Sequence, residues 1–327
     1  MSQEWDVLAT RVASSADIAA IQVLAQTQAE RHHALDDRLP EGAALSFWQI
    51  LPNGGVCWVA ESERQLVGAL CAEREQWFSD SPFANVFPRR YLRLRLFLAN
   101  GASPAPVLDR LLDCAASWPD ALAIPGRMIM TPARDAELAA ALRARGFAPY
   151  HAIAHRSLAS PPTAPASEVT IRPARRGDLP DVAALMADSW RFHAAYQPAI
   201  VLTDHLLDGC QEQAWQLAGD GAAQALLLAE RGGEVIGFFG MGISAQQPEA
   251  LPSLFAAGLY GDIFEVAVRA DQRRRGVGLA LFRAAWQWFE ARGAAAMFVN
   301  YAPTNPISSR FWPKLGFADA WINWWRG

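Results

Sequence analysis

The chain has 327 residues, of which 52% are hydrophobic and 19% charged. This composition excludes a disordered chain, and the length suits two domains better than one core. A net charge of −4 argues against a general nucleic-acid-binding protein, because such proteins are normally basic. We therefore expect a globular protein with two hydrophobic cores and no nucleic-acid partner.

The N-terminal segment and the cysteines exclude further classes of protein. "MSQEWDVLAT" lacks the basic and apolar regions of a signal peptide, and no apolar run approaches the roughly 20 residues that span a bilayer. Cys57, Cys71, Cys114 and Cys210 form no Cys-x-x-Cys pair and have no zinc-like spacing with histidine. We expect a cytoplasmic protein without a membrane partner or a metal site, whose cysteines are isolated buried thiols.

A connector divides the chain near its middle. "LASPPTAPAS", residues 158–167, is rich in proline, alanine and serine and carries no charge. Such a composition favours an extended, poorly packed segment. It predicts a first domain over residues 1–157, a linker over 158–167 and a second domain over 168–327.

The two halves contain a weak internal repeat. Arg11 and Asp17 in "RVASSADIAAI" match Arg172 and Asp178 in "RPARRGDLPDV". "RHHA" then matches "RFHA", "AESERQLVG" matches "AERGGEVIG", and "RGFA" matches "LGFA", with offsets of 161, 160, 169 and 170. The order is kept, and the second half has gained residues between the second and third matches. This pattern predicts a duplicated domain.

The second half predicts alternating strands and helices. Its first strand leads to a helix with Asp178 as N-cap and Pro180 in the first turn, and a hairpin with a turn at "RGGE" follows. Residues 262–270 predict a strand, and the apolar spacing of "VGLALFRAAWQWFEARG" predicts a helix that Gly293 ends. "AAMFVNY" predicts a buried strand, "NPISSRFWPKLG" a short helix capped by Asn305, and "FADAWINWW" a last strand. The order predicts an α/β fold, a mixed sheet with helices on its faces.

"DQRRRGVGLAL", residues 271–281, joins a predicted strand directly to a predicted helix. Gly276 and Gly278 permit backbone conformations closed to other residues and allow a ligand to approach closely. The first amides of a helix have no internal partner, and the helix dipole favours an anion there. The stretch lacks the Gly-Lys-Ser/Thr of a Walker loop, and Leu281 stands where a dinucleotide fingerprint requires its third glycine. We expect the amides of this loop to bind a phosphate group.

The six residues 273–278, Arg-Arg-Arg-Gly-Val-Gly, resemble the pyrophosphate loop Arg/Gln-x-x-Gly-x-Gly/Ala of the GNAT superfamily, the acetyl-CoA-dependent N-acyltransferases. "FEVAVRADQ" resembles the family's fourth strand, and "NPISSRFWPKLGF" resembles its Asn-led helix. "VTIRPARRGDLPDVAAL" resembles its first strand and helix. The resemblance covers about residues 168–327. Together with the repeat it implies tandem GNAT-like domains, each a mixed, mostly antiparallel sheet flanked by helices.

The resemblance implies a site for acetyl-CoA, or another short acyl-CoA, as co-substrate. Backbone groups at Val266 and Val268 would pair with the pantetheine arm, and an amide near Val266 would stabilise the oxyanion. The amides of residues 274–279 would hold the pyrophosphate, and Asn305 would bond the pantetheine chain. The implied coenzyme-binding residues are Val266, Val268, Arg273, Arg274, Arg275, Gly276, Val277, Gly278, Leu279, Asn305 and Trp312.

An amine acceptor must lose a proton before it attacks a thioester. Glu265 interrupts an apolar strand where many GNAT proteins carry Glu or Asp, and we expect it to be the general base rather than a solvent-facing rim carboxylate. Asp262 is the second choice. The family often uses a tyrosine as general acid, but Trp312 occupies that place and an indole is no practical acid. Tyr301 is the expected substitute, unless the thiolate leaves without help.

The acceptor site is expected beside the first helix and the last strand of the second half. The residues expected to border it are Arg191, His193, Tyr196 and Trp321. The alternatives are a structural role for His193 and a core position for the tryptophan. In the first half, the counterpart of the loop retains only Gly101, and two prolines remove amides from it. We expect this half to be a degenerate GNAT-like domain that binds no coenzyme.

These observations lead to one principal hypothesis about function. The chain is an N-acetyltransferase that moves an acetyl or short acyl group to a small-molecule or peptide amine by direct attack on the thioester. The alternative is a non-catalytic acyl-CoA-binding or interaction module, suggested by the missing tyrosine and the degenerate first half. The residues predict neither the acceptor nor an oligomeric state.

Overall fold

The computed structural model describes residues 8–42, 55–76, 90–99, 101–118, 123–124, 126–162, 168–197, 200–218, 223–246 and 254–327. Within them the strands form one twelve-stranded sheet, in the order β1-β2-β3-β4-β5-β12-β6-β11-β10-β9-β8-β7. Only the pairs β4–β5 and β10–β11 are parallel. The fold is therefore α/β with a mixed, mostly antiparallel sheet, as predicted.

In the described residues, the first half contributes ten elements in the order of the repeat. They are β1 (Ala9–Val12), η1 (Ser15–Asp17), α1 (Ile18–Leu35), β2 (Val56–Ser62), β3 (Gln65–Gln76), β4 (Arg90–Leu98), α3 (Pro104–Ala116), β5 (Gly126–Pro132), α5 (Ala136–Ala144) and β6 (Ala148–Ser157).

The second half repeats this order and has α7 between its first helix and its first hairpin, a stretch whose counterpart in the first half, residues 43–54, lies outside the described residues. Its elements are β7 (Thr170–Pro173), η3 (Arg176–Asp178), α6 (Leu179–Ala194), α7 (Leu206–Ala218), β8 (Gln224–Arg231), β9 (Glu234–Gln246), β10 (Gly258–Val268), η4 (Ala270–Gln272), α8 (Val277–Glu290), β11 (Ala296–Tyr301), α9 (Ser308–Lys314) and β12 (Ala318–Arg326). The predicted helix after the loop ends at Glu290, and Gly293 adopts a positive φ of 73° in the following turn.

An ion-pair triad occurs at the same place in both halves and confirms the repeat. Arg172 donates to Asp178 and to Glu230, with N···O distances of 2.7 Å for each pair. In the first half Arg11 pairs in the same way with Asp17 and with Glu61, the glutamate of the matching segment "AESERQLVG".

The predicted capping role of Asp178 needs a correction. It stands at the N-cap position of α6 but makes no side-chain bond to that helix. Its carboxylate instead accepts a hydrogen bond from the backbone N–H of Arg175 and pairs with Arg172. The side chain therefore stabilises the turn that precedes the helix, because a guanidinium competes successfully for its oxygens.

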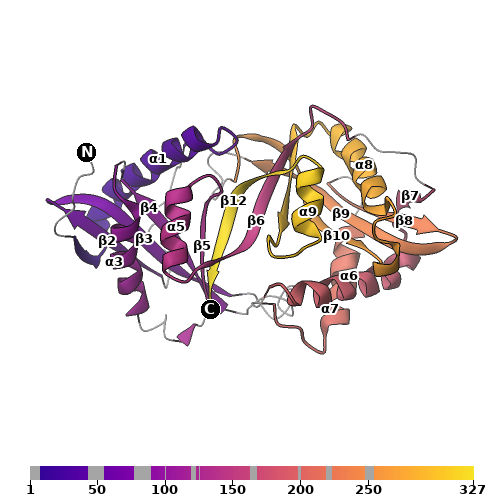
Figure 1. Cartoon of the computed structure of the whole chain (residues 1–327), viewed down its shortest axis with the longest axis horizontal. Helices are drawn as coiled ribbons and strands as arrows, with labels where there is room; N and C mark the ends of the chain where they lie inside the picture. The colour runs from indigo at the N-terminus through magenta and orange to yellow at the C-terminus, as the bar shows by residue number, and fades with distance from the viewer. Residues whose placement is uncertain are drawn as a thin grey trace.

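The two halves exchange their last strands, which the sequence did not predict. β12, the C-terminal strand, pairs antiparallel with β5 on one side and with β6 on the other. β6, the last strand of the first half, pairs antiparallel with β11 of the second half. Figure 1 shows the exchange as a yellow strand lying between two magenta ones. Each half therefore completes its part of one shared sheet with a strand from the other half.

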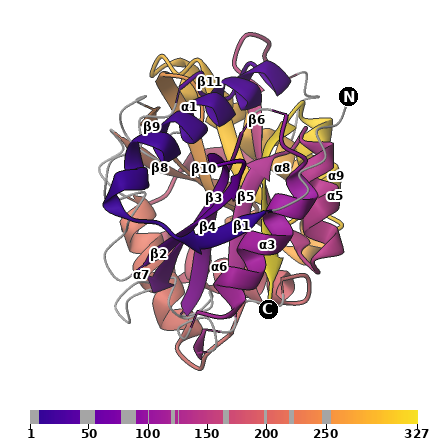
Figure 2. The ribbon, with the colours of Figure 1, turned by 90° about the vertical axis from the view of Figure 1, so that its left-hand side faces the viewer.

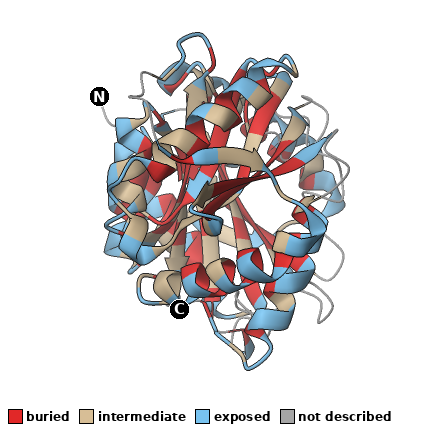
Figure 3. Ribbon diagram, turned by 90° about the vertical axis from the view of Figure 1, so that its right-hand side faces the viewer, coloured by how far each residue is buried: buried red, intermediate tan, exposed pale blue. Residues whose placement is uncertain are grey.

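Helices cover both faces of this sheet. In the first half α1 packs on one face and α3 with α5 on the other, as Figure 2 shows from that end of the molecule. In the second half α6 and α7 pack on one face and α8 on the other. Figure 3 shows the resulting pattern of exposed outer helix faces over buried strands. Each half thus has its own pair of hydrophobic layers.

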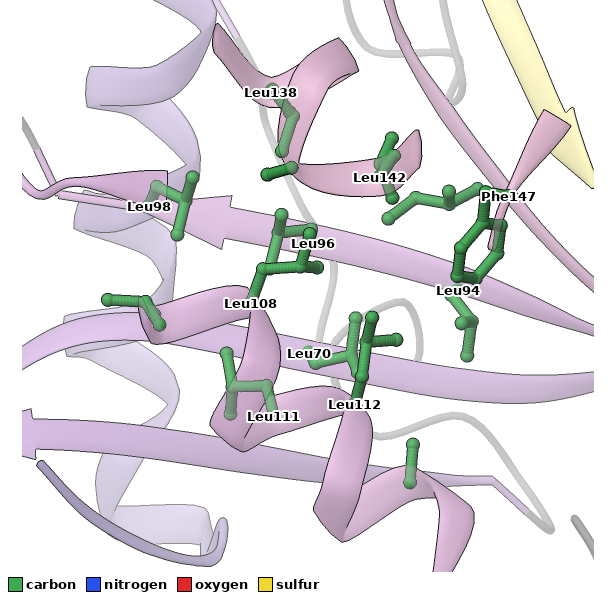
Figure 4. Close-up of a cluster of buried hydrophobic side chains, with 14 of the residues drawn as sticks. Leu70, Leu94, Leu96, Leu98, Leu108, Leu111, Leu112, Leu138, Leu142 and Phe147 are labelled. Carbon is green, nitrogen blue, oxygen red and sulfur yellow. The ribbon is translucent and has the colours of Figure 1, made fainter. Parts of the chain in front are cut away.

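Leucines dominate the larger core of the first half. Leu70, Leu94 and Leu96 project from β3 and β4 towards α3 and α5 (Figure 4). Leu108, Leu111 and Leu112 recur at helical spacing on α3, and each is at most 4% exposed. A periodic apolar face of this kind is what holds an amphipathic helix on a sheet.

Cys57 and Cys71 are buried opposite each other on β2 and β3 with their Sγ atoms 2.6 Å apart, so these two thiols are not isolated. Residues 163–167 of the expected linker lie outside the described residues. No helix in the described ranges has the length and apolar character needed to cross a bilayer. Nor do the described parts of the chain bring together three or more His, Cys, Asp or Glu residues in a metal-binding group.

Candidate active site

The loop between β10 and α8 adopts a conformation that its glycines explain. Gly276 has φ = 80° and lies directly before α8. A Cβ there would meet no atom within 4 Å, so backbone conformation rather than space favours glycine. At Gly278 a Cβ would lie 3.3 Å from the ring of Phe311, so space is restricted there. Arg274 also has a positive φ, 60°, which an arginine rarely adopts.

The loop leaves a series of backbone amides free. Among the described residues the N–H groups of residues 274–279 have no backbone acceptor, and the first bonded amide is that of Ala280, 2.9 Å from the Gly276 oxygen. These donors include the first turn of α8, where the helix dipole is positive. The arrangement suits a phosphate group.

Basic side chains surround these amides, but the guanidinium of Arg273 is engaged in other contacts. Its Nε donates to the Val268 oxygen at 3.0 Å, and its guanidinium lies 5.1 Å from the centre of the Phe192 ring. These contacts of Arg273 hold the loop against β10 and α6. Arg274 and Arg275 are exposed, as are Arg310 and Lys314 on α9, and all of them line one cavity with the amides.

This cavity, which we call the loop cavity, has a volume of about 1070 Å³. It runs from the loop along the end of β10 to the start of α9. Its lining residues are Ser189, Phe192, His193, Val266–Val268, Ala270–Leu279, Asn305–Ser308, Arg310–Trp312 and Lys314. A space of this size, with free amides and several cations at one end, accommodates a long anionic ligand.

The end of β10 is open along one edge. β10 pairs with β11 only from Tyr260 to Ile263, whereas its pairing with β9 continues to Val268. The edge of residues 264–268 that faces away from β9 therefore has no strand beside it among the described residues. An extended ligand can occupy such an edge as an added strand.

A β-bulge in the same strand brings two carboxylates to one face of the sheet. Asp262 lies opposite Gly242 and Glu265 opposite Gly240, so the extra residue between them cancels one step of alternation. In a regular strand residues three apart would point to opposite faces. Asp262 and Glu265 consequently line the same cavity.

This second cavity, the cross-half cavity, has a volume of about 730 Å³. Strands of both halves form its walls, because the exchanged strands bring β4, β5 and β6 close to β10 and β11. Its lining residues are Tyr91, Arg93, Met128, Tyr150, His151, Trp190, His193, Gln197, Gln213, Gln216, Leu217, Gln224, Asp262–Val266, Val299–Ala302, Ser308 and Trp312.

The two cavities meet. His193, Val266, Ser308 and Trp312 line both of them. Glu265 lies immediately beside this junction, on the cross-half side. A ligand in the loop cavity and another in the cross-half cavity would therefore approach each other at Val266.

Burial controls the charge of the carboxylates at the junction. It raises the pKa of Glu265 to about 7, and a hydrogen bond from the Ser189 hydroxyl at 3.2 Å opposes this in part. Burial likewise raises the pKa of Asp262 to about 7. A carboxylate with such a pKa can accept a proton at neutral pH and release it again.

The histidines of the cavity walls are neutral. Burial lowers the pKa of His151 to about 4 and also lowers that of His193. His193 contacts Asn305, whose Nδ2 lies 3.4 Å from its Nδ1. His151, on β6, contacts Gln197 in the segment after α6, which ties the first half to the second at the cavity wall.

Comparison with known proteins agrees with this geometry. Residues 184–317 match the family model described as the acetyltransferase (GNAT) family. This part of the chain therefore resembles a GNAT domain in sequence. No curated protein sequence matches the chain significantly.

The solved structures extend the likeness to the whole chain. A GCN5-related N-acetyltransferase from Sphaerobacter thermophilus is 16% identical, with a TM-score of 0.60 over 98% of this chain and 96% of its own. A GCN5-related glucosamine N-acetyltransferase region of a fungal multi-domain β-N-acetylglucosaminidase is 14% identical, with a TM-score of 0.51 over 98% of this chain and 38% of its own. A tandem GNAT protein from the clavulanic acid pathway is 15% identical over 98% of both chains, with a TM-score of 0.48. The chain therefore shares its fold, over nearly its whole length, with the Sphaerobacter thermophilus GCN5-related N-acetyltransferase.

In the part of the chain that matches the family model, the residues expected to bind coenzyme all line the same cavity. Val266, Val268, Asn305, Trp312 and the whole loop of residues 273–279 line the loop cavity. The side-chain oxygen of Asn305 accepts from the N–H groups of Ile307 and Ser308. Asn305 therefore caps the turn before α9, which begins at Ser308, and leaves its Nδ2 towards His193.

Tyr301, the expected substitute acid, has its hydroxyl engaged. It donates to Asp319 at 2.8 Å, and burial together with the charge of Asp319 raises the pKa of the tyrosine. Trp312 is 5% exposed and packs against Phe311 and Phe317. Neither Tyr301 nor Trp312 therefore offers a free acidic proton to a leaving thiolate.

Of the four residues expected at the acceptor site, His193 lines both cavities of the described chain, and the other three line neither. Arg191 is exposed and pairs with Asp188, and the ring of Tyr196 contacts that of Phe192 at a tilted angle. Trp321 lies in β12, where its Nε1 donates to the Leu254 oxygen at 2.7 Å and its ring packs against His32.

Strand exchange places Trp321 in the middle of the shared sheet, where it is 7% exposed, in agreement with the core position given above as its alternative. The cavity residues that the sequence did not reveal come from the first half or from segments without a motif. They are Tyr91, Arg93, Met128, Tyr150, His151, Ser189 and Gln197.

Proposed function

We propose that the protein is an N-acetyltransferase that transfers an acetyl group from acetyl-CoA to an amine. The loop cavity would hold the coenzyme and the cross-half cavity the acceptor. The observation that carries the proposal is the meeting of the two cavities at Val266, beside Glu265. Free amides, clustered cations and an open strand edge fit the pyrophosphate and the extended arm of the coenzyme.

Each residue at the junction would have a defined role. Acetyl-CoA would supply an activated thioester carbonyl. Glu265 would take the proton from the ammonium group of the acceptor, directly or through water, so that the nitrogen lone pair can attack the carbonyl carbon. A backbone amide near Val266 would donate to the oxygen that becomes negative. The attacking nitrogen then loses its second proton to water as the C–S bond breaks, and the thiolate, whose ordinary pKa is near ~8.5, leaves without an acid.

The pKa of Glu265 suits the proposed role as base. With a pKa near 7, Glu265 is partly ionised at neutral pH and matches the pH at which it would work. Ser189 holds its carboxylate through the hydroxyl hydrogen bond. Asp262 adds a second negative group to the acceptor cavity and would help to attract a cationic amine.

Gly276→Asp tests the coenzyme site. The substitution places a carboxylate at a residue with a positive φ, beside the expected pyrophosphate, and should weaken acetyl-CoA binding by at least 100-fold, or about 2.7 kcal/mol. Gly293→Asp is the matched control, because Gly293 also has a positive φ and open space but lies beyond the other end of α8. Calorimetry with acetyl-CoA should show a loss only for Gly276→Asp, and equal affinity in both variants would contradict the site.

A thiol-release assay with a panel of primary amines tests the reaction. Turnover of any of them supports the transferase. The engaged hydroxyl of Tyr301 favours the alternative, a module that binds acyl-CoA without transfer. Tight acetyl-CoA binding with no turnover on any amine would establish that alternative.

A further inference from the structure

A tyrosine that lines the cross-half cavity has a buried hydroxyl without a partner. Tyr150 is 4% exposed and lines this cavity, and its hydroxyl oxygen makes no hydrogen bond within the described structure. A buried polar group without a partner costs about 1–3 kcal/mol. Such a group in a cavity wall is expected where a ligand completes its hydrogen bonding.

The first half holds this tyrosine in a fixed position. Tyr150 lies on β6, and its ring packs against Trp325 of β12 with the ring centres 5.6 Å apart. Trp325 also contacts Tyr91 of β4 and fills the space beside Gly126, where a Cβ would lie 1.9 Å from the indole. The exchanged strand β12 thus places the indole of Trp325 between Tyr91 and Tyr150. Tyr150 therefore has little freedom to turn towards another partner.

The charged group on the same side of the cavity is already neutralised. Arg93 of β4 pairs with Glu75 at 3.0 Å and lies within hydrogen-bond distance of the Tyr91 hydroxyl. The unpaired charges of the cavity are therefore Asp262 and Glu265, on the opposite wall. The cavity has an acidic side for an amine and a neutral side with one free hydroxyl.

We infer that the first half forms the far wall of the acceptor site, and that Tyr150 binds a hydroxyl or carbonyl oxygen of the acceptor. The acceptor is accordingly a small primary amine with a second polar group, held between Glu265 and Tyr150. A cavity of about 730 Å³ matches a molecule of that kind. This inference rests on the proposed function, and it gives the degenerate half a part in substrate selection.

Tyr150→Phe tests the inference because it removes only the hydroxyl. The assay uses acetyl-CoA and matched pairs of amines with and without an oxygen group: hexylamine with 6-aminohexanol, phenethylamine with tyramine, and cyclohexylamine with glucosamine. We expect KM for an oxygen-bearing amine to rise about 2- to 10-fold with little change in kcat, the effect of one lost hydrogen bond. KM for its partner without oxygen should stay the same.

Stability supplies an independent readout. Since the hydroxyl has no partner in the free protein, Tyr150→Phe should leave Tm unchanged or raise it. Tyr260→Phe is the matched control: its hydroxyl donates to the Ala256 oxygen at 3.0 Å and it lines neither cavity. That control should lower Tm and leave every KM unchanged.

The outcomes separate the inference from the proposed function. Wild-type turnover with the same KM values in Tyr150→Phe, or a marked fall in its Tm, would overturn the role of Tyr150 and leave the transferase intact. Acetyl-CoA binding without turnover of any amine by the wild type would overturn both. A rise in KM confined to the oxygen-bearing amines would support the composite acceptor site.

Discussion

At the scale of single residues, the environment of Glu265 decides its chemistry. Its position in the strand was predictable, because a carboxylate interrupts an apolar run there. Its pKa near 7 was not, since this depends on burial by α6, α7 and the sheet. Ser189, the partner of Glu265, belongs to a helix 76 positions away and carries no motif.

Glu265→Gln should abolish most of the base catalysis. We expect kcat to fall about 10²- to 10⁴-fold at pH 7–8, with unchanged affinity for acetyl-CoA. The wild-type rate should fall as the pH drops below about 7, because protonated Glu265 cannot accept a proton. The variant should lack this inflection and approach the wild type near pH 10, where the amine begins to deprotonate by itself.

The control for this measurement is Asp262→Asn. Asp262 lies on the same face, and burial raises its pKa to the same region. A larger loss of kcat in Asp262→Asn than in Glu265→Gln would assign the base to Asp262. Wild-type pH profiles in both variants would remove the carboxylate mechanism.

At the scale of secondary-structure elements, the sequence predicts most of the second half. The strand–loop–helix unit around Gly276 follows from local patterns that the structure reproduces, because glycine position and apolar period act within a few residues. The bulge in β10 is a different case. Its consequence, two carboxylates on one face, depends on the pairing of β10 with β9 and not on the residues of β10 alone.

The repeated triads allow an experiment on equivalent elements. Arg172→Ala leaves Asp178 and Glu230 without their shared partner and should lower stability by about 1–3 kcal/mol at pH 7. Arg172 lowers the pKa of Asp178, so the stabilisation is present above about pH 4 and is lost as the pH falls through the folded-state pKa. Thermal unfolding of wild type and variant should therefore converge at low pH.

Arg11→Ala is the matched variant in the first half, since Arg11 pairs with Asp17 and Glu61. We expect a fall in Tm of similar size. A difference between wild type and variant that persists unchanged at pH 2 would mean that the arginines act by packing rather than by charge.

At the scale of the whole molecule, the twelve-stranded sheet unites the halves. The repeat and the last strand were predictable, but the place of β12 was not, because β-propensity does not specify a pairing partner. The cross-half cavity was not predictable for the same reason, because the exchanged strands are what bring Tyr150 and Tyr91 to its wall. The absence of coenzyme motifs predicts that the first half binds no coenzyme, but it does not predict that this half forms a wall of the cross-half cavity.

Cutting the chain between residues 162 and 168 should not yield two independent domains. The fragment 1–162 lacks β12 beside β5, and the fragment 168–327 lacks β6 beside β11. Each fragment expressed alone should be insoluble or aggregated, because it exposes unpaired strand edges. Co-expressed fragments should co-purify as a one-to-one complex in size-exclusion chromatography. Folded, monomeric single fragments would contradict the exchange.

The position of β12 also has a consequence for synthesis on the ribosome. Residues 318–326 leave the exit tunnel long after β5 (Gly126–Pro132), the strand with which they pair. The nascent first half keeps that edge of β5 open until β12 has been made, and a chain that terminates before residue 318 cannot close it. Such a premature termination would therefore damage the first half of the protein, and quality control would meet the fault in the half that was translated correctly.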